Sequence, residues 1–134
     1  MGKMHSHRIS SLVMILDLLS GCCKPISNSE LAGSYWAKYA QASEKLILSS
    51  DGHFTQEVTL KSTKNIIVAT GTWTFDSNDK EIVFNENFML VLNGVGELTK
   101  DFQHPKPRIV IFPVARSFGH FQIGSSPSIE YRKE

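Results

Sequence analysis

The sequence lacks several features that would indicate a particular chemistry. It has 14 Lys and Arg against 13 Asp and Glu, so it shows no basic excess of the kind that phosphate contacts require in nucleic-acid-binding proteins. It has no Gly-x-Ser-x-Gly motif of a serine hydrolase. His53, His104 and His120 lie far apart and lack the paired spacing of a metal site. We therefore expect no enzymatic activity, no catalytic residue, no cofactor, no metal and no nucleic-acid partner.

Cysteine is nearly absent, and the two that occur are neighbours. Cys22 and Cys23 follow the apolar run 9–19. A disulfide between adjacent residues would be strained, because bridged Cα atoms usually lie about 4.4–6.8 Å apart. The run is too short to span a bilayer as a helix, which needs about 20 apolar residues. Because Lys3 and Arg8 precede the run and small residues follow it, the pattern is typical of a secretory signal.

The residues around the first cysteine resemble a known processing motif. Leu19-Ser20-Gly21-Cys22 is similar to the lipobox of bacterial lipoproteins. The resemblance implies that the Cys22 thiol receives a diacylglyceryl group and that the signal is cleaved between Gly21 and Cys22. Residues 1–21 would be the signal peptide, and residues 22–31 the lipidated cysteine and a polar tether. An Asp in the place of Cys23 would favour the inner membrane, so the resemblance implies an outer-membrane protein facing the periplasm.

Other interpretations of the N-terminus stay open. One is an ordinary cleaved signal with an incidental Cys22, and another is a buried helix of a cytosolic protein. A third is N-myristoylation, because Gly2 and Ser6 fit that pattern. Cleavage before Cys22 would remove two basic residues and one acidic residue, leaving 12 of each. The charge of the remaining chain would then indicate no partner.

Beyond Gly33 the apolar residues recur with period two, which predicts half-buried antiparallel strands. Eight or nine short strands and hardly any helix indicate an all-β fold, a small antiparallel barrel or bent sandwich over residues 32–134. Pro113 predicts an edge strand or a bulge. The expected strands are 33–40, one through Leu46 and Leu48, 53–60, 66–76, one through Ile82 and Phe84, 88–93, 108–114, 120–123 and 128–132.

The turns predict the register of two hairpins. A three-residue loop over 50–52, with Gly52 in the left-handed conformation, gathers the apolar side chains on one face. A two-residue loop at Asn78-Asp79 does the same for the next hairpin, and Asn93-Gly94 predicts a further turn. The predicted pairs are Leu48 with Phe54, Leu46 with Gln56, Phe75 with Ile82 and Trp73 with Phe84.

A second resemblance covers roughly residues 31–84. Leu31-Ala32-Gly33-Ser34-Tyr35 resembles the Leu-x-Gly-x-Trp opening of lipocalin-like domains. The following run, through Gly71-Thr72-Trp73, is similar to small lipocalin-like bacterial lipoproteins, including the copper-resistance type. That type carries a Cys-x-x-Cys motif, which this sequence lacks. The resemblance therefore implies a lipocalin-like barrel without a metal or redox role.

Aromatic residues on the expected inner face are candidates for lining a ligand site. These are Tyr35, Trp73 and Phe75, together with Trp36 and Tyr39. Because an eight-stranded barrel is only just wide enough for side chains or one small ligand, we expect them to fill the interior.

The expected function is that of a non-enzymatic lipoprotein, held to the outer membrane by acyl chains on Cys22. Its barrel would be a binding or envelope-maintenance module for a small apolar ligand or an envelope protein. The alternative is an anchored protein inhibitor or immunity protein that acts through a loop or a sheet edge.

Overall fold

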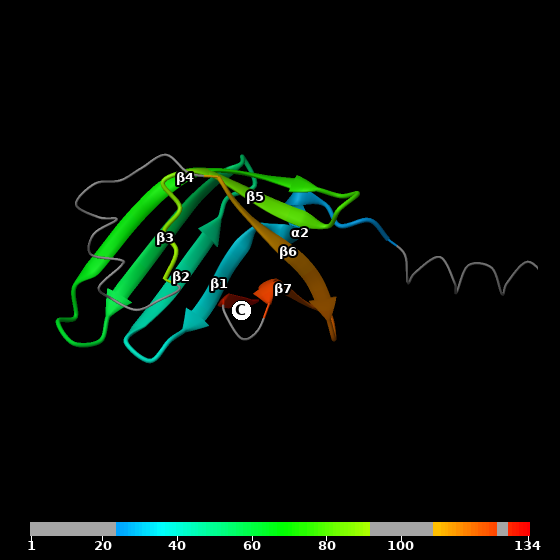
Figure 1. Cartoon of the computed structure of the whole chain (residues 1–134). Helices are drawn as coiled ribbons and strands as arrows, with labels where there is room; N and C mark the ends of the chain where they lie inside the picture. The colour runs from blue at the N-terminus through cyan, green and yellow to red at the C-terminus, as the bar shows by residue number, and fades with distance from the viewer. Residues whose placement is uncertain (1–23, 92–108, 126–128) are drawn as a thin grey trace, which may run out of the picture.

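Eight antiparallel strands, each hydrogen-bonded to the next along the chain, close into a barrel (Figure 1). The computed structural model describes residues 24–91, 109–125 and 129–134. The predicted signal peptide, Cys22, Cys23, the Asn93-Gly94 turn and His104 lie outside these residues. The all-β barrel predicted from the sequence is confirmed.

The barrel is an up-and-down meander, and in the described part of the chain one short helix precedes it. Strands β1 and β8 complete it through the pairs of Tyr35 with Lys133 and Trp36 with Arg132. No helix in the described part of the chain has the length and apolar character to cross a membrane. The elements are α2 (Asn28–Leu31), β1 (Gly33–Lys38), β2 (Ala42–Leu48), β3 (His53–Leu60), β4 (Ile66–Asp76), β5 (Glu81–Glu86), β6 (Val110–Ser117), β7 (His120–Ser125) and β8 (Ile129–Lys133).

Both predicted hairpin registers are confirmed. Gly52 has φ 90°, and all four predicted pairs occur, Leu48 with Phe54, Leu46 with Gln56, Phe75 with Ile82 and Trp73 with Phe84. The second loop is longer than predicted and spans residues 77–80. The Asp76 carboxylate explains this, because it accepts the backbone N–H groups of Asn78 and Asp79 at 2.9 and 3.2 Å.

The segment after β5 differs from the prediction. Residues 88–91, expected to begin a strand, form none and instead turn into the barrel, where Figure 1 shows them in yellow-green across β3. We call residues 88–91 the inner segment. Phe88, Met89 and Val91 are all buried. The strand prediction failed because a short apolar run has the same sequence pattern whether it pairs in a sheet or is buried in another way.

Pro113 lies where β6 changes its neighbour. Residues 110–113 pair with β5, and residues 114–117 pair with β7. Proline has no backbone N–H to donate, whereas Val114 donates its N–H to the Lys80 carbonyl at 2.8 Å. The predicted edge or bulge is therefore a switch of partner within a closed barrel.

Helix α2 packs on one end of the barrel, which we call the α2 end. Ser27 and Glu30 form a capping box, each side chain bonding the other residue's backbone N–H. Leu31 is buried, and the Tyr35 hydroxyl donates to its carbonyl at 2.7 Å. The segment expected to be a tether, residues 22–31, is thus packed against the barrel through Ile26 and Leu31.

Candidate functional site

Four polar side chains from distant parts of the chain meet inside the barrel. Tyr39 follows β1, and Glu44, Gln56 and Tyr131 lie in β2, β3 and β8. The Glu44 carboxylate accepts hydrogen bonds from the Tyr39 hydroxyl at 2.7 Å, the Tyr131 hydroxyl at 2.9 Å and the Gln56 amide at 2.6 Å. Glu44 and Gln56 are 0% exposed. We call these four residues the Glu44 cluster.

The environment of Glu44 favours its neutral form. Burial raises the pKa of the Glu44 carboxyl to about 6, although the three hydrogen bonds act in the opposite direction. Burial, and then the nearby Glu44 charge, raise the pKa of both Tyr39 and Tyr131 above their usual value. Within the described part of the chain, the groups bonded to Glu44 are all neutral donors. Glu44 is therefore a buried acid without a counter-ion from these residues.

Gln56 joins the cluster to the inner segment. Its side-chain oxygen accepts the Met89 N–H at 2.8 Å, and its amide donates to the Met89 carbonyl at 2.8 Å. A carboxamide thus bonds the backbone in the way that a neighbouring strand would. This pair of bonds holds the inner segment at a fixed position against β3.

Aromatic rings surround the first residue of the inner segment. Phe88 stacks on Phe84 with ring centroids 4.3 Å apart, and it meets Phe54 and Phe112 edge-on at 5.5 and 5.7 Å. The Tyr131 ring from β8 meets Phe88 edge-on as well, with ring centroids 6.4 Å apart. The chain's own residues therefore occupy the centre of the barrel.

Two of the three candidate ligand-lining residues hold the fold together. Tyr35 is buried and supports α2 through its hydroxyl. Trp73 is 2% exposed, and its indole N–H is shared between the Ser49 and His53 carbonyls at 3.0 and 3.1 Å. These bonds fix the loop between β2 and β3.

The other aromatic candidates lie elsewhere. Phe75 is partly buried and lines an open groove at the α2 end. Trp36 is 37% exposed and faces outward, so its expected place in the interior was wrong. It follows inward-facing Tyr35 in β1, and successive strand residues point to opposite faces. Tyr39 reaches the interior and joins the Glu44 cluster.

The described histidines do not meet. His53 faces solvent in the β2–β3 hairpin, with its Nδ1 3.2 Å from the Asp51 carboxylate. His120 begins β7 and is exposed. In residues 24–91, 109–125 and 129–134, no group of three or more His, Cys, Asp or Glu side chains is arranged to hold a metal ion.

One residue of the Glu44 cluster could be noticed in the sequence. Gln56 is a polar residue on the otherwise apolar face of its predicted strand. The sequence did not show which side chains it would bond. Glu44 became an inward residue only through the β2 register, in which Ala42, Leu46 and Leu48 share its face. Chemically, the cluster is a hydrogen-bonded network, buried except at the partly exposed Tyr39, that can bind or release one proton.

The fold and this cluster define the chain as a small up-and-down antiparallel β-barrel protein with a filled interior. No family model, curated protein or solved structure matches it.

Proposed function

We propose that this protein is a lipoprotein anchored in a bacterial outer membrane by acyl chains on Cys22, and that its barrel is a non-enzymatic binding module acting through its outer surface. The observation that supports an outer site is the occupied interior. Phe88 fills the lumen and Gln56 bonds the backbone of the inner segment at both N–H and carbonyl. A ligand in the lumen would have to displace these contacts.

The outer face of β4 is the candidate partner surface. Ile66 is 61% exposed and Val68 is 56% exposed. They are two residues apart in one strand, so their side chains lie on the same face. Single exposed apolar residues are ordinary, but neighbours of this kind favour a protein contact. We therefore propose an envelope protein as the partner.

An anchored inhibitor or immunity protein is the second candidate, and a particular feature of β4 favours it. Among the described residues, positions 66–70 of β4 pair with β3 on one side and have no strand partner on the other, because the register with β5 begins at Gly71. An unpaired strand edge can receive a strand of another protein. Partner binding through backbone hydrogen bonds at this edge would separate this candidate from binding through the outward side chains.

Site-specific photo-crosslinking from position 68 tests the outer surface. The anchored wild-type barrel should crosslink to one envelope protein, and Ile66→Lys should remove most of that product. Thr74→Lys is the matched control, because Thr74 is also exposed on β4. Equal crosslinking with Ile66→Lys and Thr74→Lys would contradict the proposed side-chain surface and would favour the strand edge.

Metabolic labelling with a palmitate analogue tests the anchor. Cys22→Ala should abolish the label and Gly2→Ala should leave it unchanged. The reverse pattern, tested with a myristate analogue as well, would establish the myristoylated form instead.

A further inference from the structure

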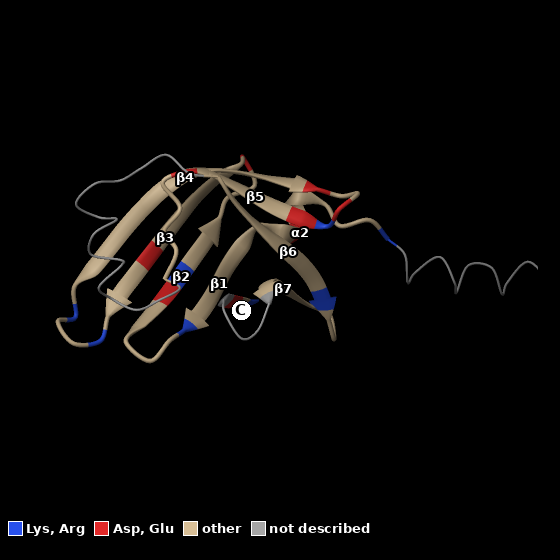
Figure 2. Ribbon diagram, in the orientation of Figure 1, with Lys and Arg blue, Asp and Glu red and all other residues tan. Residues whose placement is uncertain are grey.

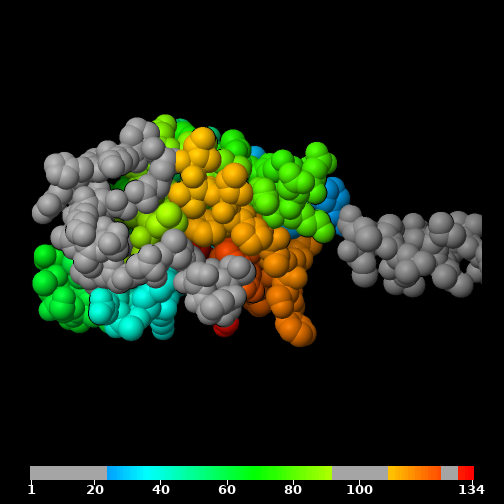
Figure 3. Space-filling model, in the orientation of Figure 1, coloured from blue at the N-terminus to red at the C-terminus, as the bar shows by residue number. Residues whose placement is uncertain are grey.

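The tip of the β6–β7 hairpin carries a phenylalanine that the barrel leaves uncovered. Phe118 is 100% exposed. It has φ 49° and Gly119 has φ 80°, the positive values of a two-residue turn that favours Asn and Gly. A bulky residue with positive φ is strained. The hairpin protrudes from the surface (Figure 3). Neither packing against the barrel nor the geometry of the turn accounts for a phenylalanine at this position.

A basic groove lies beside this hairpin, between the N-terminal segment and β6. Its volume is about 500 Å³, and no acidic residue lines it. Lys80 has no ion-pair partner among the described residues. Apolar side chains and three cations line it, namely Ile26, Phe75, Val114, Lys24, Lys80 and Arg116.

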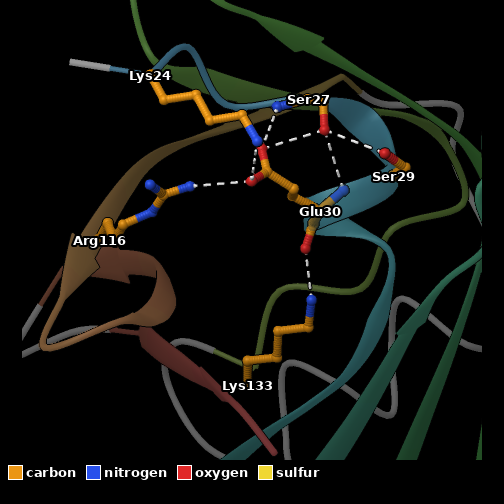
Figure 4. Close-up of polar contacts among 6 residues, drawn as sticks. All are labelled: Lys24, Ser27, Ser29, Glu30, Arg116 and Lys133. Atoms are coloured by element: carbon orange, nitrogen blue, oxygen red, sulfur yellow. Dashed lines mark hydrogen bonds and ion pairs between the residues drawn. The ribbon is translucent and has the colours of Figure 1, made fainter. Parts of the chain in front are cut away.

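Glu30 neutralises part of this charge from beside the groove. Its carboxylate lies 4.0 Å from the Lys24 ammonium and 3.5 Å from the Arg116 guanidinium (Figure 4). One carboxylate thus faces two cations, and Lys80 adds a third. Counted over its lining residues and Glu30, the groove carries three cations and one carboxylate beside apolar side chains, which suits an anionic amphiphile.

The N-terminal segment gives this surface its orientation. Figure 2 shows basic residues both on the first described residues and at the end of β6, at the same end of the barrel. Lys24 lies in the groove. Since an extended chain spans at most about 3.3–3.6 Å per residue, an acyl anchor at Cys22 would hold Lys24, two residues further on, within roughly 7 Å of the bilayer surface, and with it the groove at the α2 end.

We propose that the α2 end is a membrane-contact surface for anionic phospholipid, in which Phe118 enters the interfacial region and Lys24, Lys80 and Arg116 bind lipid phosphates. Aromatic side chains are favoured at membrane interfaces, and basic side chains are attracted to anionic headgroups. The orientation rests on the proposed anchor at Cys22. It directs the other end of β4, with Ile66 and Val68, away from the membrane and toward a protein partner.

Quenching by brominated phospholipids tests this contact in the acylated full chain, reconstituted in vesicles with phosphatidylglycerol. A fluorophore on Ser117→Cys, in a Cys23→Ala background, reports on the hairpin while keeping Phe118. A fluorophore on Thr63→Cys is the control, because the β3–β4 turn lies at the other end of the barrel. We expect at least threefold more quenching at position 117 than at position 63. Equal quenching at the two positions would overturn the proposal.

Two further variants separate the apolar and ionic parts. Phe118→Ser should reduce quenching at position 117 toward that of the control. Lys80→Glu should reduce it in anionic vesicles and leave it unchanged in phosphatidylcholine vesicles. Full quenching in both variants would contradict the assigned roles.

Failure of the anchor is distinguishable from failure of the contact. Mass spectrometry would recognise a chain without acyl groups on Cys22, and this result would contradict the proposed anchor. The same unacylated chain should still float with phosphatidylglycerol vesicles, and Phe118→Ser should weaken this binding about tenfold. Equal flotation of wild type and variant would show that Phe118 does not contact the membrane.

Discussion

The two parts of the barrel interior are held together by different kinds of contact. Toward the α2 end, Phe54, Phe84 and Phe88 pack with centroids 4.3–5.5 Å apart. Around Glu44 the contacts are hydrogen bonds among polar side chains. The inner segment serves both parts, because Phe88 packs in the aromatic part and neighbouring Met89 bonds to Gln56.

This difference determines how a substitution in each part lowers the stability of the fold. In the aromatic part, a truncated side chain leaves a cavity, and the cost follows the volume removed. In the Glu44 cluster, removal of one member leaves the others buried without partners, so the cost follows the number of unsatisfied groups. Among the described residues, Glu44 is the buried acid whose pKa is raised, so the Glu44 cluster should make stability depend on pH near neutrality.

The largest effect is expected in the aromatic part. Trp73→Ala should lower the free energy of unfolding by about 3–5 kcal/mol, the range for a buried large-to-small change. Trp36→Ala is the matched control, because Trp36 is 37% exposed and Trp73 only 2%, and it should cost less than about 1 kcal/mol. Urea denaturation followed by circular dichroism measures both. Similar costs for the two tryptophans would contradict the assigned faces of β1 and β4.

Gln56→Ala should be next, at about 1–3 kcal/mol, the range for leaving a buried polar group without its partner. It leaves the Met89 N–H and carbonyl without their partner. Thr55→Ala, on the other face of the same strand, controls for the change in strand propensity and should cost little. If Gln56→Ala and Thr55→Ala have the same stability, the amide does not hold the inner segment.

Glu44 should make the barrel less stable as pH rises. Its pKa is raised from 4.5 to about 6 in the fold, so the native state holds the proton more tightly than the unfolded chain. Its contribution is therefore greatest below pH 4.5 and is lost as pH rises through about 6, by roughly 2 kcal/mol at 1.36 kcal/mol per pKa unit. Glu44→Gln should remove this slope. The difference in unfolding free energy between wild type and variant, measured from pH 4 to 8, isolates the contribution of Glu44. A difference that stays constant over this range would contradict the raised pKa.

The smallest effect lies outside both parts, in the β2–β3 loop. Gly52 has φ 90°, so Gly52→Val should cost about 1–2 kcal/mol, the penalty of the left-handed conformation for a residue with a Cβ. Asp51→Ala should cost less, since its side chain bonds only the exposed His53. Thermal denaturation of the two variants gives the order directly. The reverse order would contradict the role assigned to Gly52.

Alternation in the sequence predicted the sheet closely, because a period of two follows directly from strand geometry. The bounds of β3 and β4, His53–Leu60 and Ile66–Asp76, agree with those predicted. Turn residues fixed the register of both hairpins. At residues 88–91 the prediction depended instead on a short apolar run, which indicates burial and does not show whether the backbone pairs with a strand.

The Glu44 cluster could not be predicted from the sequence, for a different reason. Carboxylates are mostly exposed, so Glu44 has the appearance of an ordinary outward residue. Its partner Tyr131 lies 87 residues away in the chain, and only closure of the barrel brings β8 near β2. The lipid anchor at Cys22 stays a prediction from the lipobox resemblance.

Hydrogen exchange at the Met89 amide tests most directly whether the barrel interior is occupied by its own chain. This N–H donates to the buried Gln56 oxygen at 2.8 Å. We expect it to exchange as slowly as the amides of β3 in the wild type, and to lose that protection in Gln56→Ala. Exchange of the wild-type Met89 amide at the rate of an exposed loop would show that the inner segment leaves the lumen, and would return the interior to consideration as a binding site.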